Sequence, residues 1–185
     1  ELVRNVLEHS ESSHGAIVAA RYYQKTNRIS IGICDTGIGL WKSLQTYWQP
    51  LSDLDAIHLA LSPGITGTTK REGGSSENAG AGLFFIKSIA KIARNYFMIY
   101  SGSAAYTLLK HDKRVKTAPR LFADPTMDPN TSTNTAPVFD GTLVAVDITL
   151  DETPEFKKLL SGISDAYDRA IRERKRMKYR EPRFI

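Results

Sequence analysis

The sequence predicts an α/β (α+β) protein built as a two-layer sandwich, in which helices cover one face of a mixed, mainly antiparallel sheet. Two observations lead to this prediction. Patterns of helical period and runs rich in β-branched residues follow one another in the order helix, β-hairpin, helices, long polar segment, helix and several strands. The chain has 185 residues, which is enough to bury one substantial core. Helices and strands in this order are typical of a sheet with helices packed on it.

The N-terminal part of the chain predicts a helix, a hairpin and two further helices. Residues 1–10 place their apolar side chains on one side of a helix. The runs at 16–24 and 28–35 are rich in Val, Ile and Tyr and are joined by Lys-Thr-Asn, which indicates a β-hairpin. Residues 40–49 and 53–61 have the spacing of two short helices separated by a proline.

The segment at 62–82 is rich in Gly, Ser and Thr and has almost nothing to bury. A loop of this length in a compact domain is usually a functional lid or disordered. The elements expected after it are a helix at 83–95, strands at 96–102, 104–110 and 141–150, a second long loop at 117–140, and a helix at 153–177. In the helix at 83–95, the polar side chains Lys87, Lys91, Arg94 and Asn95 form a narrow stripe, so this helix is expected to be mostly buried. We divide the chain into a domain at 1–150 and a C-terminal helix with a basic tail at 151–185.

Composition excludes several classes of protein. The net charge is +5, but residues 169–183 carry eight Lys or Arg against two Glu, so the rest of the chain is nearly neutral. A basic tail of this kind can bind nucleic acid or an acidic partner, but it is more often the solvated face of a helix. Nucleic acid is not an expected partner, because no stacking platform or zinc-type spacing accompanies the tail. No apolar run reaches the roughly 18 residues of a membrane span. The single Cys34 excludes an internal disulfide and favours a reducing, cytoplasmic location.

The first candidate for chemistry is the pair Glu1 and Asn5, one helical turn apart on the same stripe. A carboxylate can orient or deprotonate an attacking group. An amide oxygen can join the ligand shell of Mg²⁺, which commonly keeps several waters and binds substrate phosphates. Because Glu1 already lies inside a helical pattern and is not a methionine, we expect the sequence to be a fragment whose upstream part is missing.

The second candidate is the Asp-Thr-Gly-Ile-Gly stretch at 35–39, where Asp35 ends a strand and Gly37 and Gly39 allow a close turn. A carboxylate at such a position can accept a hydrogen bond from an exocyclic amine such as that of adenine. The alternative is a plain Asp-Gly turn.

The third candidate is Gly80 and Gly82, which precede a helix and leave backbone N–H groups open to an anion such as phosphate. A hinge without ligand is the alternative. The sequence lacks the motif of a phosphate-binding P-loop, and no GxGxxG opens a βαβ unit.

Taken together and in this order, the stretches at 1–5, 35–39 and 80–90 resemble the N box and the two glycine boxes of the GHKL ATPase superfamily, which includes DNA gyrase B, heat-shock chaperones, histidine kinases and MutL. The Gly-Thr strand at 141–150 is a fourth match. The resemblance covers about residues 1–150 and implies the histidine kinase-like ATPase fold with ATP and Mg²⁺ as cofactors. It assigns Asp35 to the adenine amine with support from Thr142, Asn5 to Mg²⁺, and Gly37 and Gly39 to the adenine pocket. It further assigns Gly80, Gly82, Leu83 and Phe84 to the phosphates, residues 62–79 to an ATP lid, and Glu1 to the general base of hydrolytic members.

The branch within this superfamily is left open by the sequence. Residues 5–10 are similar to a run found in histidine kinases and anti-sigma-factor serine kinases, which implies a signalling protein kinase with a protein phosphoacceptor. Glu8 departs from the basic residue often found there, so Arg4, Lys70 or Arg71 would have to supply positive charge for phosphate. The alternatives are an ATP-hydrolysing conformational switch of the chaperone or MutL type, and a nucleotide-binding module without turnover. A homodimer is compatible with each.

Overall fold

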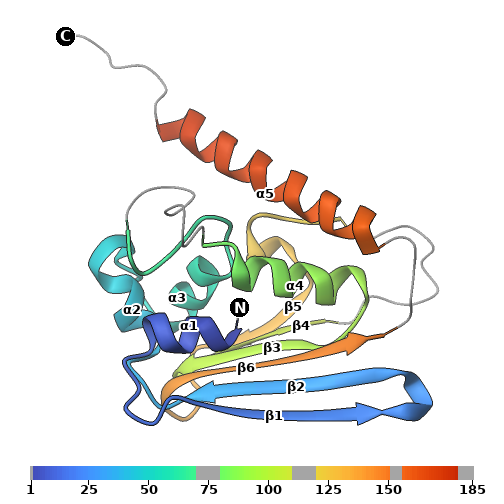
Figure 1. Ribbon diagram of the computed structural model, residues 1–185. Helices are drawn as coiled ribbons and strands as arrows, with labels where there is room; N and C mark the ends of the chain where they lie inside the picture. The colour runs from blue at the N-terminus through green and yellow to red at the C-terminus, as the bar shows by residue number, and fades with distance from the viewer. Residues whose placement is uncertain (1, 70–79, 110–119, 151–155, 179–185) are drawn as a thin grey trace.

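A computed structural model describes residues 2–69, 80–109, 120–150 and 156–178 (Figure 1). It has an α+β architecture in which an open sheet carries the helices on one face. The predicted hairpin, the two short helices after it and the long C-terminal helix are all present. Among the described helices, none combines the length and apolar character needed to span a bilayer.

The described strands form a six-stranded sheet in the order β1-β2-β6-β3-β4-β5. Their bounds are β1 Ala16–Tyr23, β2 Arg28–Asp35, β3 Phe97–Gly102, β4 Ala104–Leu108, β5 Asn130–Thr133 and β6 Phe139–Thr149. Side chains alternate between the two faces as a pleated strand requires, which is clearest in β3, where every second residue is buried. The turn between β1 and β2 is a short 3₁₀ helix, Gln24–Thr26, closed by Asn27 in the left-handed region.

The expectation of a mixed sheet was wrong for the described strands, because every pairing among them is antiparallel. The reason lies in the last strand, β6, which is inserted between β2 and β3 and runs antiparallel to both. The strands β2 and β3 therefore run in the same direction, but β6 separates them and no parallel pair forms.

Five described α-helices accompany the sheet: α1 Leu2–His9, α2 Gly39–Trp48, α3 Asp53–Ala60, α4 Gly82–Ile92 and α5 Phe156–Lys178. Helices α1 to α4 lie on one face, and no described helix covers the opposite face (Figure 1). The core between the layers is formed mainly by Ile57, Leu61, Ala90, Phe97, Ile99, Ala104, Tyr106, Leu108, Val144 and Val146. Helix α5 lies across the outside of α4, where Tyr167 packs against Phe84 and Phe85.

The region at 117–140 differs from the expected long loop. It contains a 3₁₀ helix, Pro125–Met127, and the edge strand β5, whose polar sequence Asn-Thr-Ser-Thr lacks an apolar alternation. Asp128, between these elements, is buried and accepts hydrogen bonds from the ammonium groups of Lys87 and Lys91 of α4. The two lysines of the predicted polar stripe therefore belong to a buried ion-pair cluster with Asp128.

Candidate functional site

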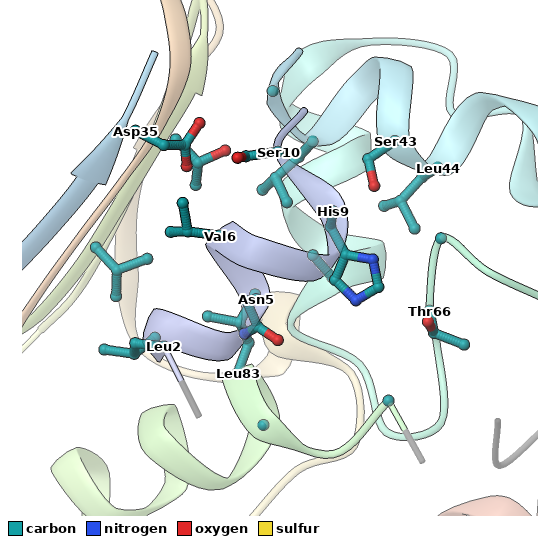
Figure 2. A pocket seen from close by; sticks show the side chains of 18 of the residues that line it. Leu2, Asn5, Val6, His9, Ser10, Asp35, Ser43, Leu44, Thr66 and Leu83 are labelled. Atoms are coloured by element: carbon teal, nitrogen blue, oxygen red, sulfur yellow. The ribbon is translucent and has the colours of Figure 1, made fainter. Parts of the chain in front are cut away.

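A pocket of about 840 Å³, a figure that includes the open solvent at its mouth, lies between the sheet and the helices α1, α2 and α4 (Figure 2). The lining combines residues of α1, the ends of β2 and β6, the first half of α2, the segment after α3 and the start of α4. Apolar side chains dominate its walls, among them Leu2, Val6, Ile33, Leu44, Ile65, Leu83 and Val144.

Asp35 is the buried acidic residue of this pocket and is 4% exposed. It is the last residue of β2, and its Oδ1 accepts a hydrogen bond of 2.9 Å from the N–H of Gly37. Burial raises the pKa of the Asp35 carboxyl above its ordinary value, and backbone hydrogen bonds from Gly37 and Thr142 oppose that shift. A donor on a ligand would offset the remaining cost of burying this charge, because buried carboxylates require hydrogen-bond partners.

The turn after Asp35 is packed directly against the end of α1. The N–H of Ile38 donates to the carbonyl oxygen of Ser10 at 2.7 Å. A Cβ on Gly37 would lie 1.9 Å from that same oxygen. The contact with α1 therefore accounts for glycine at position 37, which does not line the pocket itself.

Replacing Gly37 with alanine should destabilise the fold by about 1–3 kcal/mol, because the new methyl group would push α1 away from the turn. Gly32 is the matched control, since it lies in β2 and a Cβ there meets nothing within 4 Å. Urea unfolding of the two variants measures the difference, and equal transition midpoints for Gly37→Ala and the wild type would contradict the packing argument.

The start of α4 forms another side of the pocket. Gly80 has a φ of +62°, and a Cβ on it would lie 2.5 Å from the carbonyl oxygen of Ile65. Its own carbonyl accepts a hydrogen bond from the N–H of Gly64 at 3.0 Å. The helix then begins after Ala81, which has no polar side chain to cap it. The N–H groups of the first turn therefore depend on acceptors other than an N-cap side chain.

Helix α1 presents Asn5 and His9 to the pocket from one face, one turn apart (Figure 2). Glu1 lies outside the described residues. Within the described parts of the chain, no cluster of three or more His, Cys, Asp and Glu side chains is arranged to hold a metal ion. Among the described lining residues, Asn5 supplies an amide oxygen that could join the ligand shell of a cation.

The structure brings together seven of the residues expected at the site. Asn5, Asp35, Gly39, Gly80, Gly82, Leu83 and Thr142 all line the pocket. The side chain of Phe84 does not, because it is 1% exposed and packs against Tyr167 of α5. Of the expected lid at 62–79, residues 62–69 are described and Ile65, Thr66 and Gly67 border the pocket, whereas 70–79 lie outside the described residues.

Sequence reasoning did not identify two polar residues of the site. Ser10 and Ser43 also line it. Isolated Ser and Thr residues carry no spacing signal that would set them apart from surface residues. No Lys or Arg occurs among the described lining residues, and the candidates Lys70 and Arg71 lie outside the described residues. Searches with the sequence against models of protein families and against curated proteins find no match.

Proposed function

We propose that this pocket binds ATP together with Mg²⁺, and that the chain is the catalytic ATP-binding part of a signalling protein kinase. One observation carries the proposal: the buried carboxylate of Asp35 and the uncapped start of α4 border the same pocket, although they come from distant parts of the sequence. The kinase assignment rests in addition on the resemblance of residues 5–10 to those of histidine kinases and anti-sigma-factor kinases.

The pocket supports recognition of adenine. A flat heterocycle is held by apolar contacts on its faces and by a few polar groups at its edge. Val6, Ile33 and Val144 supply apolar surface near Asp35. The Asp35 carboxylate is an acceptor, and it matches the exocyclic amino group of adenine, which is a donor.

The start of α4 supports the binding of phosphate. The partial positive charge of a helix N-terminus and its backbone N–H groups favour an anion. Mg²⁺ typically binds through one or two protein oxygens, several waters and substrate phosphates. The amide oxygen of Asn5 is the described group suited to that role, and a bound ion would neutralise phosphate charge.

Isothermal titration calorimetry with ATP and excess MgCl₂ tests the binding step. We expect saturable binding at one site per chain, and weaker binding when EDTA removes the metal. Absence of binding at millimolar ATP would overturn the proposal. ADP serves as the control for a nucleotide that lacks the transferable phosphate.

Incubation with γ-labelled ATP and any co-encoded partner protein tests the chemistry. Label on a protein acceptor supports the kinase assignment. Release of free phosphate without a phosphoprotein, abolished by Glu1→Ala, would instead indicate the ATP-hydrolysing switch. Binding without either reaction would indicate a nucleotide-binding module.

A further inference from the structure

Ser101 lies directly behind the pocket wall without reaching the pocket. It is in β3, is 2% exposed, and contacts two segments whose residues line the pocket. One segment is the turn into α2, where the N–H of Leu40 donates to Ser101 Oγ at 2.9 Å. The other is the start of β6, where Ser101 Oγ lies 2.8 Å from the Gly141 carbonyl and 3.3 Å from Thr142 Oγ1.

The chemistry of a hydroxyl group fixes the direction of these three hydrogen bonds. A serine hydroxyl has one proton to donate and two lone pairs that accept. The Gly141 carbonyl can only accept, so it takes the Ser101 proton. The Leu40 N–H can only donate, so it occupies one lone pair. In the remaining contact, Thr142 must therefore be the donor and Ser101 the acceptor.

This assignment leaves the Thr142 hydroxyl without a proton for a ligand. Its single proton is directed at Ser101. Thr142 lines the pocket, and its Oγ1 can therefore only accept a hydrogen bond, through its lone pairs, from a molecule bound there. Asp35 and Thr142, which lie next to each other at the ends of β2 and β6, therefore both act as acceptors.

We propose that Ser101 is a positioning residue that holds the Thr142 hydroxyl as an acceptor, so that this end of the pocket selects a purine with an amino group at C6 over one with an oxo group. The inference rests on the proposed nucleotide-binding function. An oxo group is itself an acceptor. It would face the Asp35 carboxylate and the Thr142 oxygen, and neither of these acceptors could donate a hydrogen bond to it. An amino group has two protons and can serve both Asp35 and Thr142, directly or through a water.

The test compares the affinities of ATP and inosine triphosphate, which differ at C6 and in the proton on N1. The wild-type protein should prefer ATP. In Ser101→Ala the Thr142 hydroxyl is free to rotate and donate to the oxo group, so the preference for ATP should fall about threefold to tenfold, the effect of one neutral hydrogen bond. A purely structural role of Ser101 would weaken both nucleotides equally and leave their ratio unchanged.

Two further variants sharpen the result. Thr142→Val removes the hydroxyl with little change of shape and should also lower the preference, and adding Ser101→Ala to it should have no further effect on the ratio. Ser88→Ala is the control, because Ser88 is fully buried in α4 and its hydroxyl has no hydrogen-bond partner among the described residues. It should leave the ratio at the wild-type value.

The outcomes separate this inference from the function on which it rests. Suppose that ATP binds but Ser101→Ala leaves the ratio of ATP affinity to inosine triphosphate affinity unchanged. The role of Ser101 is then overturned and ATP binding stands. The same conclusion follows if Ser101→Ala changes this ratio as much in the Thr142→Val protein as in the wild type. If Ser101→Ala does not fold, an unchanged ratio in Thr142→Val overturns it. If the wild-type protein binds neither nucleotide, the proposed function falls, and this inference falls with it.

Discussion

Replacement of Asp35 with asparagine should lower the affinity for ATP about tenfold to a hundredfold, which corresponds to the loss of a charge-assisted hydrogen bond of roughly 1.5–3 kcal/mol. The carboxylate accepts from the adenine amino group, whereas an asparagine amide can present a donor to a group that is itself a donor. Calorimetric titration with ATP and Mg²⁺ measures the change. Asp140→Asn, at an exposed aspartate of β6, is the control and should bind ATP as the wild type does.

Unchanged ATP affinity in Asp35→Asn would refute the assignment of this residue. The pH dependence of stability provides an independent check that Asp35 is buried and ionised. Burial raises the pKa of Asp35 in the folded protein above its ordinary value of 3.8, so the resulting stabilisation is present at low pH and is lost as pH rises through the folded pKa. Asparagine does not titrate. The stability of the variant relative to the wild type should therefore increase as the pH rises above the ordinary Asp pKa of 3.8, as measured by urea unfolding.

Replacement of Asp128 with asparagine should lower the free energy of unfolding by about 3–5 kcal/mol, the usual effect of removing one partner from a buried ion pair. The Lys87 ammonium lies 2.6 Å from the Asp128 carboxylate, Lys91 contacts the other oxygen, and their side chains are 1% and 5% exposed. Burial lowers the pKa of Lys87, and the charge of Asp128 opposes that shift. Without the carboxylate, two ammonium groups would remain buried, and Asp124 would be the carboxylate that still acts on Lys87.

Urea unfolding measures this loss, with Asp140→Asn again as the control. The control should stay within about 0.5 kcal/mol of the wild type, because substitutions of exposed residues have small effects. A similarly small effect of Asp128→Asn would show that the lysines reach water or another acceptor, and would contradict the buried cluster.

The sequence predicted the local elements well wherever apolar residues recur with the period of one helix or one strand. The hairpin of β1 and β2 and the helices α2 and α3 lie within one or two residues of their expected bounds. Asp35 and the start of α4 were identifiable as site residues because each combines a strand or helix end with nearby glycines. Asn5 was a candidate because it lies one helical turn from Glu1, whereas Thr142 was identified only through the family resemblance.

The features that were not predictable depend on contacts between distant segments. A mainly antiparallel sheet was predicted, but the absence of any parallel pair among the described strands follows from the insertion of β6, which no local pattern encodes. Strand β5 has only polar residues and is defined by its neighbour β4. The lysines of α4 are buried only because Asp128, 37 residues beyond Lys91, meets them. The glycine at position 37 is required by the carbonyl of Ser10, directly after α1, rather than by a ligand.

The position of β6 also has a consequence for the order of folding. The hairpins β1–β2 and β3–β4 are local structures, but they belong to one sheet only through β6, which follows both in the sequence. Arg28 of β2 pairs with Thr149 of β6, so joining the halves closes a loop of more than a hundred residues. Such non-local pairing is characteristic of slow folding. During synthesis, the edges of the two hairpins that pair with β6 would stay unpaired until β6 has emerged from the ribosome. Unpaired strand edges make a nascent chain prone to aggregation, so this interval carries the largest risk.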